Sequence, residues 1–281
     1  MKIKNAFSID VEDYFQVAAF DKIIQPSAWP QFEIRVERNV DTLLAMLATH
    51  RAQATFFTLG WVAERFPQMV KRIVAGGHEL ASHGYGHQKI TSLSAEQFRE
   101  DVIRAKGILE DLGGSAIRGY RAPSFSIGAS NLWAHDVLLE TGHAYSSSVY
   151  PVKTDHYGMP EAPRFAWKSK SGLVEIPPSS IRLAGRNLPA SGGGYFRLLP
   201  LSMSRWSFNQ VNKEGEAAIF YCHPWEIDPG QPRMKNATLK SRFRHYVNLS
   251  TNEKKISDLL ANGAWGRMDE VFKAHLPQRA N

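Results

Sequence analysis

The chain of 281 residues is long enough to bury one large hydrophobic core or two small ones. A hydrophobic fraction of 43% and a charged fraction of 22% are typical of a globular protein. The net charge is +7, but the basic residues are spread along the chain and form no Lys/Arg block that would indicate nucleic-acid binding. The single cysteine, Cys222, excludes an intramolecular disulfide and a cysteine-based zinc site.

The two ends of the chain and its hydropathy give an expectation about location. The N-terminus lacks the long apolar run of a signal peptide, and no window of about 20 apolar residues could span a membrane. We therefore expect a cytoplasmic protein. The mild positive charge is compatible with an anionic glycan or a membrane surface nearby, although a solvated basic surface is the simpler explanation.

The first half of the sequence alternates strands and helices about every 30 residues, which indicates parallel β-α units. Apolar segments predict strands at 3–9, 54–60 and 79–82, and strand-and-turn segments at 117–124 and 144–151. Periodicity, N-cap residues and glycines predict helices at 35–50, 61–66, 67–76, 94–112 and 131–141.

The alternation stops after Pro151. The remaining predicted elements are a short strand at 173–178, a Gly-rich turn at 191–197, a helix at 200–212, a buried strand at 217–225, a basic loop at 233–244 and a final helix at 252–260. The buried strand ends on a histidine, His223, and the basic loop could touch anionic lipid.

Side chains suited to metal binding and proton transfer follow the predicted strands. Asp10, Glu12 and Asp13 follow the first strand, and His83 and His87 follow the strand at 79–82. In a closed barrel the carboxyl ends of parallel strands converge on one rim. A helical turn after the strand would put both imidazoles on one face, where they could share a metal ion. The alternatives are solvated turn acids, a Ca²⁺ loop, and two unrelated surface histidines.

Later strand ends add Arg121, Pro123 and His223. Two imidazoles and one carboxylate form the open three-ligand site of a catalytic zinc ion. A free carboxylate can then act as a base, and a separate histidine as an acid. The alternatives are that His223 only packs in the core and that Arg121 only forms a surface salt bridge.

Five short segments are each a weak signal alone, but their occurrence in this order is highly specific. They are Ser8–Asp13, His83–His87, Arg121–Pro123, Tyr145–Pro151 and Ile219–His223. In this order they resemble the motifs of the polysaccharide deacetylases of carbohydrate esterase family 4, with a nodulation-type chitooligosaccharide deacetylase domain. There are departures: Asp10 is followed by Val11 instead of a second aspartate, Gly84 replaces a hydroxyl residue, and Ser146 stands where an aspartate is common. Segments 10–15, 192–197, 223–229 and 243–246 resemble the subgroup encoded with exopolysaccharide loci of the exosortase type.

The resemblance implies an α/β fold, a distorted (β/α)7 barrel at residues 1–225 with a C-terminal extension, 226–281, packed on it. It implies Zn²⁺, or another divalent metal such as Co²⁺, Ni²⁺ or Mn²⁺, held by His83, His87 and an acid. Relatives with an Asp-x-Asp pattern favour Glu12 for that acid over Asp13.

The resemblance also implies an N-deacetylase that removes acetyl groups from N-acetylhexosamine units of an exopolysaccharide or its precursor. The metal would polarise the acetamide carbonyl and a water molecule, and Asp10 would take the water's proton while paired with Arg121. His223 would protonate the departing amine. Candidates for substrate contact are Tyr150, Pro123, Trp225 and Tyr195, although aromatics in such loops more often only pack.

The expected partner is an N-acetylated glycan and not nucleic acid, with peripheral contact to a membrane or to polysaccharide assembly proteins compatible with the basic loop. Two other functions stay open. A hydrolase of small cyclic amides or imides would need a closed pocket in place of an open groove. A catalytically silent glycan-binding module would keep the groove aromatics without metal-dependent turnover.

Overall fold

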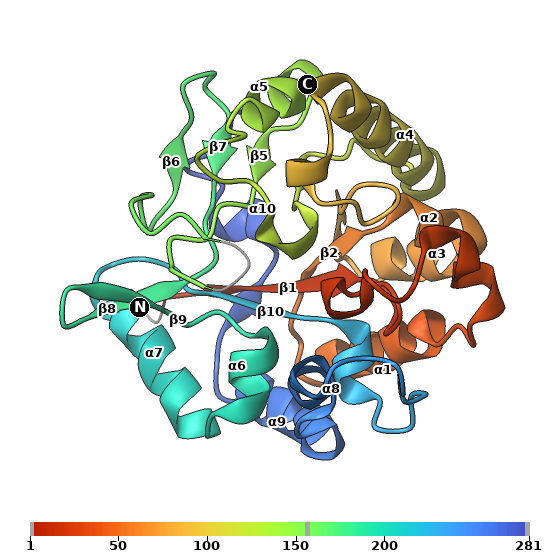
Figure 1. Cartoon of the computed structure of the whole chain (residues 1–281). Coiled ribbons are helices and arrows are strands. Elements are labelled where there is room, and N and C mark those ends of the chain that lie inside the picture. Colours follow the sequence, from red (N-terminus) through yellow and green to blue (C-terminus); the bar gives the residue numbers. More distant parts are fainter. Residues whose placement is uncertain (1–2, 155–157, 279–281) are drawn as a thin grey trace.

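The computed structural model describes residues 3–154 and 158–278, and its centre is a curled sheet surrounded by helices (Figure 1). The strands of this sheet are β1 (Asn5–Val11), β2 (Thr55–Thr58), β3 (Glu79–Ser82), β4 (Gly119–Tyr120), β5 (Tyr145–Ser146), β6 (Trp167–Lys168), β7 (Val174–Glu175), β10 (Ile219–Cys222) and β11 (Trp265–Gly266). Their order is β10-β1-β2-β3-β4-β5-β7-β6, with β11 also paired to β1. All pairs are parallel except β6 with β7. The sheet forms a half barrel, so the predicted distorted (β/α) barrel is confirmed.

The helices cover the outer face of the sheet (Figure 1). They are α1 (Val36–Thr49), α2 (Gly60–Arg65), α3 (Pro67–Ala75), α4 (Ala95–Gly113), α5 (Ala134–Glu140), α6 (Gly193–Leu198), α7 (Leu201–Lys213), α8 (Leu239–Tyr246), α9 (Leu249–Ala261) and α10 (Met268–Val271). None of these helices, within the described ranges, has the length and hydropathy needed to cross a membrane.

The capping residues of α4 show why its predicted bounds agree with the structure. The Ser94 side chain accepts a hydrogen bond from the Gln97 amide, and the Gln97 side chain accepts one from the Ser94 amide. At the other end Gly114 adopts a left-handed conformation with φ of 64°, which glycine tolerates without strain. Local side chains therefore set both ends of this helix.

The second half of the chain departs from the prediction in several places. A two-stranded hairpin, β8 (Ser180–Leu183) and β9 (Arg186–Pro189), was not predicted. Helix α6 begins within the predicted Gly-rich turn, and helix α8 begins within the predicted basic loop and extends two residues beyond it. Such short elements carry too little periodicity to be recognised, and tertiary packing stabilises them. Strand β11, which pairs with β1, and helix α10 were also missed. The division of the chain at residue 225 stays a prediction.

The registers of the parallel strands align their carboxyl ends. Val11 lies beside Thr58, Thr58 beside Ser82, and Ser82 beside Tyr120. On the other side of β1, Ile9 lies beside Cys222. The residues that follow β1, β3, β4 and β10 therefore emerge at the same edge of the sheet, as in α/β barrels in general.

Candidate active site

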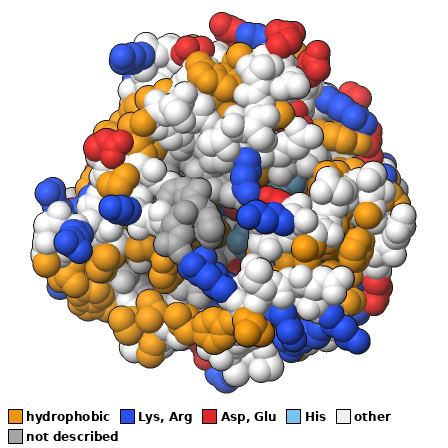
Figure 2. Space-filling model, in the orientation of Figure 1, with side chains coloured by type: hydrophobic (Ala, Val, Ile, Leu, Met, Phe, Trp, Pro, Cys, Tyr) orange, Lys and Arg blue, Asp and Glu red, His pale blue; other side chains and the backbone are white. Residues whose placement is uncertain are grey.

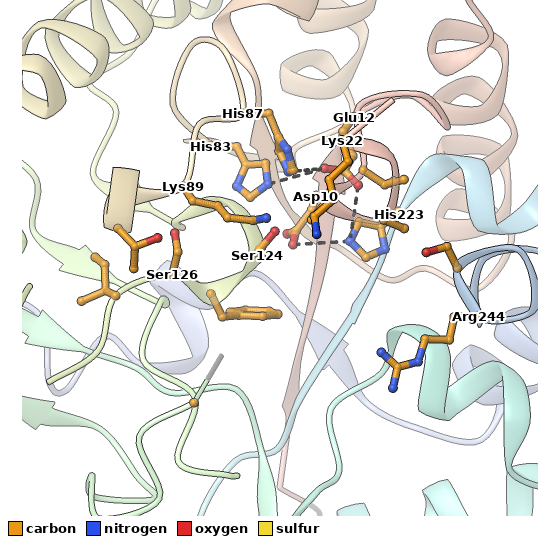
Figure 3. Close-up of a pocket in the computed structure, with 18 of the residues that line it drawn as sticks. Asp10, Glu12, Lys22, His83, His87, Lys89, Ser124, Ser126, His223 and Arg244 are labelled. Atoms are coloured by element: carbon orange, nitrogen blue, oxygen red, sulfur yellow. Dashed lines mark ion pairs between the residues drawn. The ribbon is translucent and has the colours of Figure 1, made fainter. Parts of the chain in front are cut away.

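Three side chains at this edge could together hold a metal ion: Glu12, His83 and His87. Their ligand atoms all lie within 4.8 Å of one another. The Glu12 carboxylate lies 2.6 Å from His87 Nε2 and 3.9 Å from His83 Nε2. His83 Nδ1 lies 2.8 Å from the Arg121 carbonyl oxygen, and this contact orients the ring so that Nε2 faces the carboxylate (Figure 3). Two imidazole nitrogens and one carboxylate suit a divalent ion such as Zn²⁺.

A loop connects the two histidines, and the helical turn that the sequence analysis considered for this segment does not form. Gly84 has φ of 75° and His87 has φ of 51°, both in the left-handed region. A Cβ atom at Gly84 would lie 2.7 Å from an Asp101 carboxylate oxygen. That carboxylate accepts a hydrogen bond of 2.9 Å from the Tyr85 amide and holds the loop. The structure thus accounts for the glycine at this position.

Asp10 forms a buried ion pair with Arg121. Arg121 Nη1 lies 2.6 Å from Asp10 Oδ1 and 2.9 Å from Ser8 Oγ. The rest of the guanidinium donates to the Ser147 carbonyl and hydroxyl oxygens and lies 4.1 Å from the centre of the Phe57 ring. Because Arg121 is 0% exposed, the alternative of a surface salt bridge is wrong. The guanidinium holds Asp10 Oδ1 in place, and the other carboxylate oxygen, Oδ2, faces the cavity.

The His223 ring lies between acidic side chains: one of its nitrogens faces Asp10 and Glu12, and the other faces Glu226. Its Nε2 lies 4.0 Å from Asp10 Oδ2 and 3.8 Å from Glu12 Oε1 (Figure 3). Its Nδ1 lies 3.4 Å from Glu226 Oε2, and Glu226 is itself paired with Arg197 at 2.8 Å. Sequence reasoning missed Glu226, although an acid three residues after a strand-ending histidine was visible in the sequence.

Burial and neighbouring charges shift the pKa values of His223, Glu12 and His83. Burial alone would lower the pKa of His223, but Glu12, Glu226 and Asp10 raise it to about 9. Burial would raise the pKa of Glu12, but His87 and His223 hold it well below its usual value. Burial lowers the pKa of His83 to about 4, against the opposing effect of Asp10. The site therefore pairs a protonated His223 with a neutral His83 and an ionised Glu12 near neutral pH.

The other candidate ligand, Asp13, lies apart from the histidines. One of its oxygens accepts hydrogen bonds from the Arg35 and Val36 amides, at 2.6 and 2.9 Å, and the other from its neighbour Tyr14. These amides begin helix α1, where a carboxylate satisfies otherwise unpaired N–H groups. Among the two acids, the structure therefore puts Glu12 beside the histidines and uses Asp13 as a helix cap.

A cavity of about 780 Å³ opens over these residues, and Figure 2 shows histidine and acidic side chains inside a hollow of the surface. Of the four candidates for substrate contact, Trp225 lines it. Trp225 also donates a hydrogen bond of 3.2 Å to Glu12 and stacks on His223. Tyr150, Pro123 and the exposed Tyr195 are not among the residues that line this cavity, and contact between them and a substrate stays a prediction. Phe125 and Tyr221 line it instead.

Comparisons with known proteins agree with this architecture. The family model described as Polysaccharide deacetylase matches residues 22–143, and one described as a domain of unknown function (DUF3473) matches residues 147–273. A peptidoglycan-N-acetylglucosamine deacetylase of Bacillus cereus is 38% identical over 93 residues, which are 33% of this chain and 34% of that protein. A chitooligosaccharide deacetylase of Sinorhizobium fredii is 32% identical over 109 residues, 38% of this chain and 48% of that protein. The chain thus spans less than half the length of these two relatives.

Solved structures show the same fold. A candidate polysaccharide deacetylase from Mycobacterium smegmatis superposes with a TM-score of 0.64 at 20% identity, covering 98% of this chain and 92% of the other. Puue allantoinase superposes with a TM-score of 0.61 at 15% identity, covering 97% and 89%. The similarity to polysaccharide deacetylases in sequence thus extends over residues 22–143, and the similarity in fold over nearly the whole chain.

Proposed function

We propose that the chain is a metal-dependent N-deacetylase of glycans that contain N-acetylhexosamine. The observation that carries this proposal is one cavity lined by Asp10, Glu12, His83, His87 and His223. A base, a metal-binding trio and an acid are the groups that hydrolysis of an acetamide needs. The relatives act, by their names, on peptidoglycan and on chitooligosaccharides, which supports an N-acetylglucosamine-containing substrate.

Glu12, His83 and His87 would hold Zn²⁺ or a similar ion, which polarises a carbonyl and a water molecule when bound. Asp10 accepts the proton of the attacking water, and Arg121 holds this carboxylate in place. His223 donates a proton to the nitrogen of the breaking C–N bond, so that the products are acetate and a free amine. Glu226 positions His223 by facing its Nδ1. Trp225 positions Glu12 through its indole N–H.

Two alternative functions are less well supported by the same cavity. A small cyclic amide would need a closed pocket, whereas this cavity is large and open at the surface (Figure 2). A catalytically silent binding module would have no use for a buried Asp10–Arg121 pair beside a metal-binding trio. The exopolysaccharide role remains a proposal based on the motif resemblance.

We also propose that helix α8 contacts an anionic membrane. Leu239 and Phe243, four residues apart on this helix, are 80% and 61% exposed, and Lys240 and Arg242 lie between them. Exposed apolar side chains interleaved with cations are typical of a membrane-surface helix. Sedimentation with anionic lipid vesicles should fall when Leu239 and Phe243 become serine, and when Arg233, Lys235, Lys240 and Arg242 become glutamine. Unchanged sedimentation would remove this proposal.

The deacetylase proposal is tested by acetate release from N-acetylglucosamine oligomers. We expect release from the metal-loaded chain, none after chelation, and recovery when Zn²⁺ is added back. Metal bound near one per chain without any acetate release would mean that the substrate is different. Neither metal binding nor acetate release would support the silent binding module.

A further inference from the structure

Two segments of the chain contain basic residues but no acids. Residues 176–213 include five Lys or Arg residues and no Asp or Glu, and the same holds for residues 229–252. The first segment forms the hairpin β8–β9, α6 and α7, and the second contains α8. Neither segment therefore carries a negative side chain that could offset its positive charge.

The elements of these two segments adjoin one another in the structure. Strand β8 packs on α7, and α6 leads directly into α7. Arg197 of α6 donates hydrogen bonds of 2.9 and 2.7 Å to the carbonyl oxygens of Arg244 and His245, so α6 also adjoins α8. In Figure 1 the hairpin, α7, α6 and α8 follow one another along the lower edge of the molecule. We call their joint surface, from residues 180–213 and 233–246, the acid-free face.

The acid-free face also holds most of the large hydrophobic side chains that are exposed. Among the described residues, eleven such side chains are exposed, and eight of them lie on this face. Apart from the two on α8, they are Leu183 and Leu188 of the hairpin, Tyr195 and Leu198 of α6, and Met203 and Trp206 of α7. Figure 2 shows a band of hydrophobic side chains over these elements at the lower left, with Lys and Arg side chains beside it. A continuous apolar patch of this kind is typical of an interaction surface.

Basic side chains lie on the same sides of these elements as the apolar ones. Across the hairpin, Arg186 stands opposite Leu183, and Leu188, two residues further along β9, points to the same face. On α7, Lys213 comes seven residues after Trp206, which is about two turns along the same side of the helix. Both Arg186 and Lys213 are exposed.

We infer that the acid-free face docks the protein on an anionic lipid surface. Such binding needs apolar and aromatic side chains that enter the headgroup region, and cations that face the anionic lipids. The acid-free face supplies both. A second copy of the chain fits less well, since a symmetric contact would bring the cations of two identical faces together without an acid from either. The inference extends the contact proposed for α8 to the neighbouring elements and does not depend on the deacetylase chemistry.

Co-sedimentation of the full chain with lipid vesicles tests the inference. The vesicles contain either phosphatidylcholine alone or phosphatidylcholine with the anionic lipid phosphatidylglycerol. We expect the chain to bind the anionic vesicles at least about tenfold more tightly at low salt, and this difference to shrink as the salt concentration rises. Equal binding to both kinds of vesicle, or binding to neither, overturns the inference.

An apolar variant locates the contact. Leu198, Met203 and Trp206, all changed to serine, should weaken binding to the anionic vesicles about tenfold or more. Ile103 and Leu139, which are exposed on α4 and α5 outside the acid-free face, provide the matched control. Changing these two residues to serine should leave binding as it is, and equal binding by both variants overturns the inference.

A charge variant keeps the test decisive if the apolar variant does not fold. Arg186→Gln together with Lys213→Gln should weaken binding to the anionic vesicles about tenfold. Lys71→Gln together with Lys170→Gln, at exposed positions outside the acid-free face, is the matched control and should bind as the unchanged chain does. Binding that survives the change of Arg186 and Lys213 overturns the inference.

Three further results separate this inference from the other proposals. If the serine changes of Leu239 and Phe243 abolish binding while the variants of α6, α7 and the hairpin bind normally, the contact is confined to α8 and the inference fails. A dimer in sedimentation velocity without lipid that the apolar variant dissociates would also overturn it. Acetate release from soluble oligomers should be equal in all variants, because none of the changed residues lines the cavity, so failed docking and failed deacetylation are distinguishable.

Discussion

Glu226 lies 3.4 Å behind His223, on the side of the imidazole that faces away from Asp10 and Glu12. Glu226 also accepts a hydrogen bond of 3.0 Å from the His223 amide, so it fixes both the backbone and the ring. A carboxylate in this position stabilises the imidazolium, which the proposed proton donor needs.

Glu226→Gln tests this relationship. His223 has a pKa of about 9 and must be protonated to act as an acid, so acetate release should decline as pH rises through that value. Without the Glu226 charge the pKa of His223 falls, and the decline should begin at lower pH, with kcat at neutral pH reduced about tenfold. The pH profile of kcat measures this. Glu253→Gln, an exposed change on α9, is the matched control, and an unshifted profile would contradict the role of Glu226.

Asp10→Asn tests the proposed base. The amide cannot accept the proton of water, so acetate release should fall about 100-fold or more. Metal content should stay unchanged, because Asp10 does not belong to the trio of Glu12, His83 and His87. Elemental analysis and an acetate assay on the same preparation measure both. Asp41→Asn, on the exposed face of α1, serves as the control, and full activity of Asp10→Asn would exclude it as the base.

Glu12→Gln and Asp13→Asn form a matched pair of variants that tests whether Glu12 is the metal ligand and Asp13 the cap of helix α1. Glu12→Gln should lose most of the bound metal, since the trio keeps only its two imidazoles. Asp13→Asn should keep the metal but lower the free energy of unfolding by about 1 kcal/mol, because Asp13 caps α1. Metal per chain and denaturant unfolding measure these effects. Metal loss in Asp13→Asn with retention in Glu12→Gln would reverse our assignment.

His143 should make the fold less stable in acid. Burial, together with Lys106, lowers the pKa of His143 to about 3 from an ordinary value of 6.5, so the unfolded chain binds a proton that the folded chain does not. The stabilisation is present above about pH 6.5 and is lost as pH falls towards 3, by about 1.4 kcal/mol per pH unit. His143→Gln should lose stability less steeply between about pH 6 and pH 4 in denaturant titrations. An unchanged slope would contradict this role.

Local sequence features were sufficient to predict much of the first half of the chain. Strand β3 at Glu79–Ser82 and helix α4 follow from apolar runs, a capping box and a terminal glycine. The hairpin β8–β9 and the short elements β11 and α10 escaped prediction, since residues distant in sequence stabilise them. Strand β11, for example, is held by pairing with β1 from the other end of the chain.

The sequence by itself was sufficient to predict that the acids and histidines at the strand ends lie at the same edge of the sheet. Parallel strands that alternate with helices bring their carboxyl ends to one edge, whatever the details of packing. Only the tertiary structure showed which of Glu12 and Asp13 lies beside the histidines. The Asp13 carboxylate accepts hydrogen bonds from the amides at the start of α1, and the Glu12 carboxylate contacts His87. The tertiary structure also placed Glu226 behind His223. Past the end of a strand, the direction of a side chain depends on distant partners that local propensity does not encode.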